Sequence, residues 1–223
     1  MKGIVCSFLL LSTLVSTAQD CQHFLFLQKD KTIEITVYDK KGEANGKSIY
    51  HVSDVSNSGG ITKGSVASEM FNKKGKSMAK SNCQMQCNGG VLMIDMQLML
   101  PQQQAEQMKT EAKARNAYLE YPAKMAVGDV LKEGNMDIDM TNGGLASNMN
   151  MVISDRKVES RESVTTEAGT WDCYKISYKG KLTIKMGPIP INMNMDGTEW
   201  YAPNFGIVKT QSKYGTTAIT SIK

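Results

Sequence analysis

The sequence predicts a mainly β (α+β) fold, in which a curled antiparallel sheet forms a half-barrel around one main helix at about residues 101–119. Three observations predict this fold. Apolar and polar residues alternate in many short segments, glycine-containing turns separate these segments, and one glycine-free stretch interrupts them. The composition, with 41% hydrophobic and 22% charged residues, is typical of a globular protein. It excludes a wholly disordered, a collagen-like or a multi-span membrane chain.

Residues 1–18 are predicted to be a cleaved secretory signal. Lys2 precedes an apolar run at residues 4–15, and small residues at 16–18 fit a cleavage site before Gln19. The run is too short for a membrane-spanning helix, which needs about 20 residues. A lipoprotein signal ending at Cys21 is the alternative, but Gln19-Asp20 fits its pattern badly. We therefore expect residues 19–223 to form a single exported domain, periplasmic or secreted, with no integral membrane span.

Four cysteines remain after cleavage, Cys21, Cys83, Cys87 and Cys173. An oxidising compartment favours disulfides, and four cysteines allow three pairings, among which the sequence does not choose. Cys83 and Cys87 lie in an alternating segment, where four strand residues span about 13 Å. A disulfide needs Cα atoms within about 7 Å, so these two are not expected to pair with each other. The spacing also suits a soft metal, but neither histidine is near in sequence, so disulfides are preferred and no metal site is predicted.

The predicted strands are short alternating segments. They include residues 33–37, 136–140, 149–153, 182–186 and 191–195. Turns are predicted at Lys41-Gly42, Gly59-Gly60, Lys74-Gly75, Gly89-Gly90, Gly143-Gly144, Ala168-Gly169 and Lys179-Gly180. The segment at 38–43 resembles that at 71–76, and both are interpreted as cationic hairpin tips.

The interruption begins at Pro101, a residue suited to the first turn of a helix. No glycine or further proline occurs through Tyr118, and Ala105, Met108, Ala112 and Leu119 form one narrow apolar stripe. We expect this helix to lie in the concave face of the sheet as a plug or lid.

Several segments resemble a family of secreted bacterial proteins known as a domain of unknown function. They are residues 38–42, 87–90, 95–104, 127–131, 168–176 and 199–209. The last two, which contain Trp171-Asp172-Cys173 and Trp200-Tyr201-Ala202-Pro203, are the most specific. The resemblance implies a fold related to the half-barrel of lipoprotein carriers such as LolA and LolB, and a location in the cell envelope. It implies no established activity and no catalytic residues.

The 16 methionines suggest a candidate binding surface. Residues i and i+2 of a strand share a face, so Met149/Met151, Met193/Met195 and Met136/Met140 each place two thioethers on one side. Three interpretations stay open: methionines that fill the core, a groove that repacks around a lipid or acyl chain, and Cu(I) ligands. The groove candidates are Met136, Ile138, Met140, Met149, Met151, Met193 and Met195, with Met108 and Ala112 from the helix.

Motifs of catalysis are missing from the sequence. It contains no Gly-x-Ser-x-Gly, phosphate-loop or His-Glu-x-x-His pattern, and its only histidines, His23 and His51, are interpreted as structural or surface residues. Asp137 and Asp139 alternate with apolar residues and are expected on the solvent face. Trp171, Trp200 and Tyr201 suit either a packed corner or an aromatic groove rim.

The sequence therefore predicts a non-enzymatic exported envelope protein without a cofactor, which binds an apolar ligand such as a lipid or acyl chain in a Met-lined concave face. One alternative is a structural or assembly factor that binds another envelope protein, and a lesser one is Cu(I) binding through the methionine pairs. The net charge of +4 is too small to indicate nucleic acid as a partner.

Overall fold

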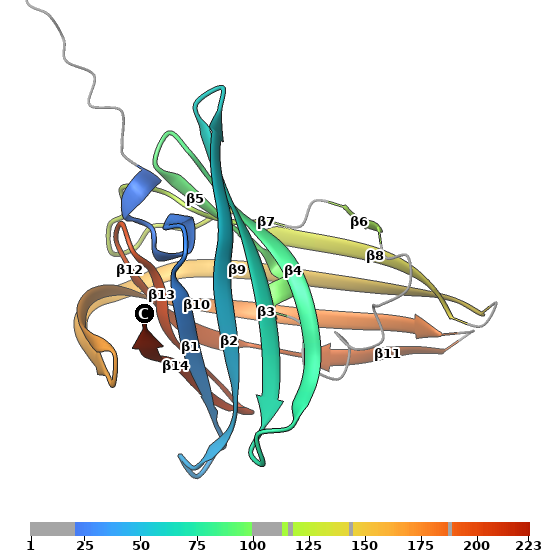
Figure 1. Ribbon diagram of the computed structural model, residues 1–223. Coiled ribbons are helices and arrows are strands. Elements are labelled where there is room, and N and C mark those ends of the chain that lie inside the picture. The colour runs from blue at the N-terminus through green and yellow to red at the C-terminus, as the bar shows by residue number, and fades with distance from the viewer. Residues whose placement is uncertain (1–20, 100–112, 116–117, 143–144, 187–188) are drawn as a thin grey trace, which may run out of the picture.

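The computed structural model describes residues 21–99, 113–115, 118–142, 145–186 and 189–223. Strands and turns make up nearly all of this part of the chain (Figure 1). The strands are β1 (Thr32–Tyr38), β2 (Ala44–Ser58), β3 (Ile61–Asn72), β4 (Ser77–Asn88), β5 (Val91–Asp95), β6 (Lys113–Arg115), β7 (Tyr118–Tyr121), β8 (Gly134–Asn142), β9 (Leu145–Thr166), β10 (Gly169–Met186), β11 (Ile189–Asn194), β12 (Gly197–Ala202), β13 (Gly206–Ser212) and β14 (Gly215–Ile222). Three 3₁₀ turns complete the list: η1 (Cys21–His23), η2 (Leu25–Leu27) and η3 (Met96–Met99).

All strands belong to one antiparallel sheet, in the order β6-β8-β9-β10-β12-β13-β14-β1-β2-β3-β4-β5-β7, and β11 pairs with β10 beside this path. Most neighbours are joined by hairpins, as the turn pattern predicts. The turn predicted at Lys179-Gly180 is wrong, because both residues lie inside the long strand β10 and pair with β9. The sheet curls until β7, at one end of the order, contacts β8 near the other end. In Figure 1, β2, β3 and β4 run across the front of β8, β9 and β10. The predicted curled antiparallel sheet is confirmed, and it forms a nearly closed barrel.

The predicted helix at 101–119 is wrong where the structure describes it. Lys113–Arg115 is strand β6 and Tyr118–Tyr121 is strand β7, and the described residues contain no α-helix. In β7, Leu119 and Tyr121 are buried, whereas Tyr118 and Glu120 lie on the other face. This period of two and the two tyrosines favour a strand over the stripe with helical spacing that included Leu119. Met108 and Ala112 lie outside the described residues.

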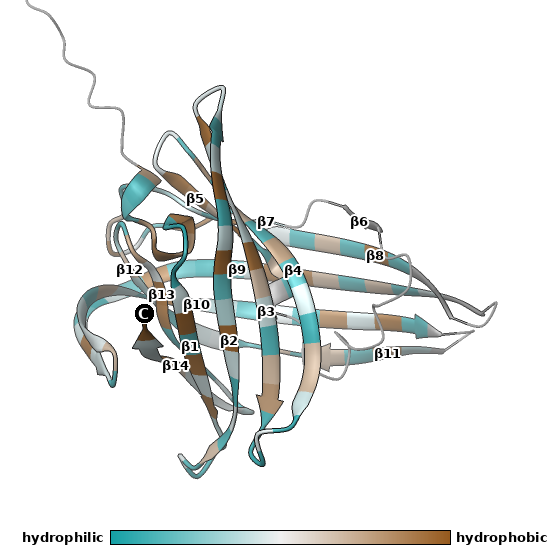
Figure 2. Ribbon diagram, in the orientation of Figure 1, coloured by the Kyte–Doolittle hydropathy of each residue, from teal (hydrophilic) through white to brown (hydrophobic). Residues whose placement is uncertain are grey.

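The amino-terminal segment seals one end of the barrel interior. Phe24, Leu25 and Leu27, in and beside η2, are buried in the hydrophobic core. The Leu25 N–H donates to the carbonyl of Phe205 at 3.0 Å, and a disulfide joins Cys21 to Cys87 in β4. Figure 2 shows the η2 ribbon in the colour of hydrophobic residues, in agreement with its burial.

A bulge divides the long strand β9. Asp155 has a φ of 50°, and the register with β10 shifts beside it. Before the bulge, Met149, Met151 and Ile153 are buried; after it, Arg156 is. One extra residue moves the side chains that follow it to the opposite face of the sheet, until a second register shift at Glu159 reverses the change. The bulge at Asp155 therefore turns Arg156 into the barrel.

Within the described residues, no helix is long and apolar enough to cross a membrane.

Candidate functional site

The inner face of β8–β11 carries an apolar surface built from two cross-strand rows. Directly opposed residues form these rows, because each strand pairs with the next in regular register. The first row is Met136, Met151, Leu182 and Met193, and the second is Ile138, Met149, Ile184 and Ile191. We call these eight residues the apolar face.

Burial of the apolar face declines from β8 toward β11. Met136, Met151 and Leu182 are fully buried, and Met193 in the same row is only half-buried. In the second row exposure rises to 51% at Ile191, at the β11 end. The apolar face is thus covered on its β8–β9 side and open at β11, which pairs only with β10 among the described strands.

Two glycines shape the base of the apolar face. Gly134 and Gly180 lie opposite Ile153 in the next cross-strand row. A Cβ on Gly134 would lie 2.8 Å from the Met96 sulfur, and a Cβ on Gly180 would lie 2.7 Å from the carbonyl oxygen of Met195. The missing side chains therefore let Met96 and the segment after β11 approach the sheet closely.

The outer face of the same strands is polar. Asn150 Nδ2 donates to Asp137 at 2.8 Å, Asn148 Nδ2 donates to Asp139 at 2.8 Å, and the Thr183 hydroxyl donates to Asn192 at 2.9 Å. These cross-strand hydrogen bonds occupy the two aspartates on the side away from the apolar face, as the alternation predicts.

The structure places six of the nine predicted groove residues on or beside the apolar face. Met136, Ile138, Met149 and Met151 lie in its buried part, Met193 lies at its half-buried edge, and Met195 follows β11. Met140 pairs with Ser147 in the β8–β9 ladder, and Met108 and Ala112 lie outside the described residues. Leu182, Ile184 and Ile191 also lie on this face but are absent from the predicted groove residues, although they belong to the same alternating segments.

Two of the four candidate cysteines form a disulfide. Cys21 and Cys87 are joined, with Cα atoms 5.8 Å apart. Cys83 and Cys173 are buried free thiols, and burial raises the pKa of each to about 12. The prediction that Cys83 and Cys87 do not pair with each other is confirmed, because both lie in the strand β4. In the described part of the chain, no cluster of His, Cys, Asp and Glu could hold a metal ion.

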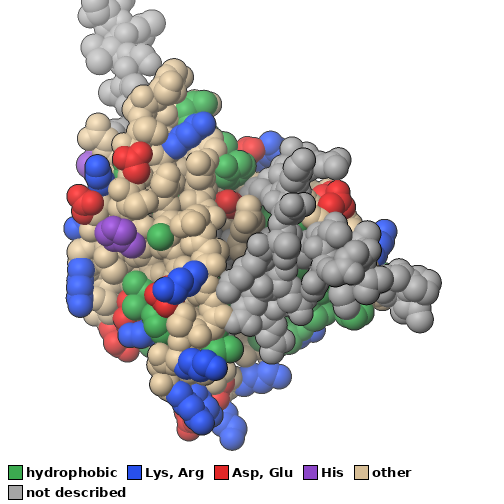
Figure 3. Space-filling model, turned by 45° about the vertical axis from the view of Figure 1, so that its right-hand side comes forward, with side chains coloured by type: hydrophobic (Ala, Val, Ile, Leu, Met, Phe, Trp, Pro, Cys, Tyr) green, Lys and Arg blue, Asp and Glu red, His purple; other side chains and the backbone are tan. Residues whose placement is uncertain are grey.

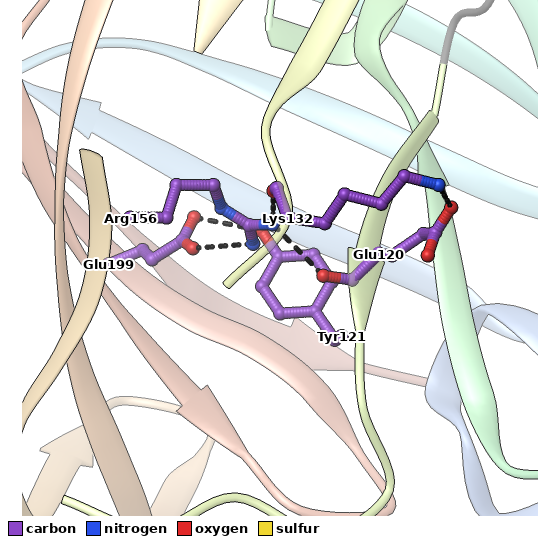
Figure 4. A network of polar contacts seen from close by, with 5 residues as sticks. All are labelled: Glu120, Tyr121, Lys132, Arg156 and Glu199. Carbon is purple, nitrogen blue, oxygen red and sulfur yellow. Dashed lines mark hydrogen bonds and ion pairs between the residues drawn. The ribbon is translucent and has the colours of Figure 1, made fainter. Parts of the chain in front are cut away.

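A buried polar network lies at the seam of the barrel (Figure 4). The Arg156 guanidinium lies 3.3 Å from the carboxylate of Glu199 in β12, and the Tyr121 hydroxyl donates to the same carboxylate at 2.9 Å. The Tyr121 ring stacks on Tyr201 with ring centroids 4.8 Å apart. Burial raises the pKa of the Glu199 carboxyl, and Arg156 and the Tyr121 hydroxyl oppose this rise.

The same guanidinium connects the two ends of the sheet. Arg156 Nη1 donates to the carbonyl of Glu120 in β7 at 2.9 Å and to that of Lys132, just before β8, at 3.0 Å. Strands β7 and β8 are in contact here without a ladder of hydrogen bonds between them. Arg156 therefore provides hydrogen bonds to backbone carbonyls that no neighbouring described strand reaches between β7 and β8. For this reason we assign the network to closure of the barrel. The sequence does not indicate this network, because Arg156-Lys157 is typical of a solvated charge pair unless the bulge is known.

The three aromatic candidates do not share a rim. Trp171 packs on Phe205 with centroids 5.1 Å apart, and Tyr201 lies inside against Tyr121. Trp200 lies on the outer face beneath Lys175 and Lys209, and its Nε1 donates to Glu162 at 2.5 Å. Their separate packing favours the interpretation as packed corners over an aromatic groove rim.

A separate polar depression of about 430 Å³ lies over β3, β4 and the end of β5. Its lining includes Ser65, Cys83, Gln84, Asp95 and Tyr118. The Gln97 N–H donates to Asp95 at 2.9 Å, and Gln86 donates to the Tyr118 hydroxyl at 2.7 Å. The protein's own groups thus engage Asp95 and Tyr118, and the apolar face is the stronger candidate for a ligand.

Comparison with known proteins identifies the fold and the family. A candidate exported protein with a YmcC-like fold from Bacteroides fragilis matches with a TM-score of 0.71 and 20% identity, over 90% of this chain and 98% of its own. A candidate lipoprotein from Parabacteroides distasonis matches with a TM-score of 0.72 and 22% identity over the same shares. Comparison with curated protein sequences gives no significant match. The DUF3108-like family matches residues 28–221, nearly the whole described chain, and the protein belongs to this family.

Proposed function

We propose that this protein is a non-enzymatic exported envelope protein that holds an apolar ligand, a lipid or acyl chain, against the apolar face of β8–β11. The observation that carries the proposal is the continuity of this face from full burial at Met136 to 51% exposure at Ile191. A hydrocarbon chain that lies along the exposed end of the apolar face would cover Ile184, Ile191 and Met193. Burial of apolar surface in this way favours binding by about 25 cal/mol per Å².

The chemistry of the face supports a ligand of variable shape. Methionine is unbranched and has three rotatable side-chain bonds, so its thioether adapts to irregular apolar partners. The neighbouring row positions are isoleucine and leucine, which offer no hydrogen bond and no nucleophile. The face therefore suits binding of a hydrocarbon without chemical change to it.

Export is supported by two observations. The Cys21–Cys87 disulfide is typical of an oxidising compartment, such as the bacterial periplasm. The two solved proteins of the same fold are described as a candidate exported protein and a candidate lipoprotein.

The test is native mass spectrometry of the purified protein after exposure to a bacterial lipid extract. We expect bound lipid with the wild type, and a loss of at least about tenfold in Ile191→Gln/Met193→Gln, because two apolar contacts are replaced by polar groups. Val127→Gln/Val130→Gln is the matched control, since both valines are exposed in the loop before β8. No bound lipid in the wild type, or equal loss in the two variants, would reject the proposal.

A second candidate function is assembly with another envelope protein. Strand β11 pairs only with β10 among the described strands, so its outer edge offers backbone groups to a partner strand. A pull-down from an envelope fraction that returns one stoichiometric protein, with no lipid in the native mass spectrum, would favour this candidate.

A further inference from the structure

Three hairpin turns lie side by side at one end of the sheet. They connect β1 to β2, β3 to β4, and β13 to β14. Tyr38 at the end of β1 pairs with Thr216 in β14, and Gly46 in β2 pairs with Asn72 at the end of β3. The three turns therefore form one continuous edge, and Figure 3 shows Lys and Arg side chains gathered at this lower end of the molecule.

The edge carries a strong excess of positive charge. Its lysines are Lys40, Lys41, Lys73, Lys74, Lys76 and Lys213, and all six are exposed. Asp39 and Glu43 are the acidic residues of the three turns, which leaves the turns with a net charge of +4. Glu167 from the β9–β10 turn lies beside them and accepts the Tyr38 hydroxyl at 3.3 Å. Within the described part of the chain, none of the six lysines forms an ion pair. We call these six residues the lysine edge.

The same local geometry holds the first two turns. Asp39 Oδ1 accepts the backbone N–H groups of Lys41 at 2.8 Å and Glu43 at 3.0 Å. Asn72 Oδ1 accepts those of Lys74 at 2.9 Å and Lys76 at 3.1 Å. This explains the resemblance between residues 38–43 and 71–76, because a short Asx side chain replaces the missing turn partners in both. The Asp39 and Asn72 side chains hold the backbone of the turns, so the lysine side chains are not needed for this and extend into solvent.

We propose that the lysine edge docks the protein on an anionic lipid surface. All six cations are lysines, whose flexible ammonium groups suit diffuse attraction to a charged surface; planar recognition of single carboxylates favours arginine. Tyr214 lies next to Lys213, is 57% exposed, and has the Lys213 ammonium 5.1 Å from its ring centroid. An exposed tyrosine beside lysines is typical of the membrane–water interface.

The lysine edge also lies next to the open side of the apolar face. The Tyr214 hydroxyl donates to the carbonyl of Asn194, the last residue of β11, at 3.3 Å. Docking through the edge would bring Met193 near the lipid surface. The docking proposal does not depend on a bound ligand, because it rests on the charges and on Tyr214 alone.

The experiment is co-sedimentation of the full-length mature chain with vesicles of phosphatidylcholine, with and without phosphatidylglycerol. We expect binding only to vesicles that contain phosphatidylglycerol, reduced at high ionic strength. Lys73→Gln/Lys74→Gln/Lys76→Gln should lower the partition coefficient at least about tenfold. The control, Lys63→Gln/Lys124→Gln/Lys223→Gln, removes the same charge from exposed lysines away from the turns and should bind as the wild type does.

Three outcomes would overturn the docking proposal: equal binding to both vesicle types, equal loss in the two triple variants, or capture of one stoichiometric acidic protein without vesicle binding. Tyr214→Ser gives an independent check, because it keeps every lysine and should still weaken binding. If the protein binds vesicles but carries no lipid in the native mass spectrum, the docking proposal is supported and only the proposed lipid ligand is contradicted.

Discussion

Arg156 and Glu199 face each other at 3.3 Å inside the barrel, with side chains that are 0% and 1% exposed. Burial of two charges costs free energy, which their attraction and their hydrogen bonds offset. Here the carboxylate also accepts the Tyr121 hydroxyl, and the guanidinium also donates to two carbonyls at the seam. Among the described residues, Arg156 Nε has no hydrogen-bond partner. We therefore interpret the pair as a structural link between β7 and β8, the sheet ends that no described ladder of backbone hydrogen bonds joins.

Substitution of Arg156 by Met should therefore destabilise the fold strongly. It leaves the Glu199 carboxylate buried without its cation and removes the donor from two carbonyls, at a cost of about 3–5 kcal/mol. Urea denaturation followed by far-UV circular dichroism measures this loss. Arg161→Met is the control, because the Arg161–Asp172 pair is exposed and should contribute less than about 1 kcal/mol. Similar losses in the two variants would contradict the assignment of Arg156 to the seam.

The bulge at Asp155 makes a second prediction, on backbone strain. A φ of 50° is tolerated by Gly and Asp but is costly for a β-branched residue. Asp155→Val should lower the free energy of unfolding by about 1–2 kcal/mol relative to Asp155→Gly. Both variants lose the exposed ion pair with Lys179, so their difference isolates the backbone. If valine and glycine were equally stable in thermal and urea melts, the bulge would not be strained at this residue.

The sequence predicts the apolar face well, because regular strands keep a period of two. Met149 and Met151 share the inner side as expected, and their partners Met136 and Ile138 lie opposite them. The curled antiparallel sheet follows from the same alternation and from the glycine turns. The cross-strand register that aligns these segments into rows is a property of the assembled sheet, so no single segment shows that the face opens at β11.

The parts that the sequence did not predict depend on departures from that period. Arg156 lies inside only because Asp155 adds one residue to β9. Leu119 matches a helical stripe in sequence, yet pairing of β7 with β5 makes it a strand residue. The pairing of Cys21 with Cys87 depends on the path of η1 and η2 across the barrel end, which has no periodic signal.

That disulfide gives a third prediction. It closes a loop across a sequence separation of 66 residues and anchors the segment that seals the barrel end. Cys21→Ser/Cys87→Ser should lower the free energy of unfolding by about 2–4 kcal/mol, because the unfolded chain gains freedom. Urea melts with and without a reducing agent measure the effect. Reductant should destabilise the wild type and leave the double variant unchanged, and a wild type that is insensitive to reductant would refute the role of the bond.

The last prediction concerns pH and the buried carboxyl of Asp95. Burial raises the pKa of Asp95 more than the backbone N–H groups of Gln97 and Gln84 lower it. The folded protein therefore keeps this proton to a higher pH than the unfolded chain does. The resulting stability is complete below the unfolded pKa and is lost as the pH rises through the folded pKa. Asp95→Asn cannot ionise, so it should become more stable relative to the wild type between acid and neutral pH.

Urea denaturation of the wild type and of Asp95→Asn over this pH range measures the difference. Glu199 has its own raised pKa, but it is present in both proteins and cancels in the comparison. The amide can still accept the Gln97 N–H, which limits the structural change. The quantity compared is the free energy of unfolding of Asp95→Asn minus that of the wild type. If this difference stays constant with pH, the effect of Asp95 comes from hydrogen bonding alone. If it falls toward neutral pH, the folded protein favours the ionised carboxylate.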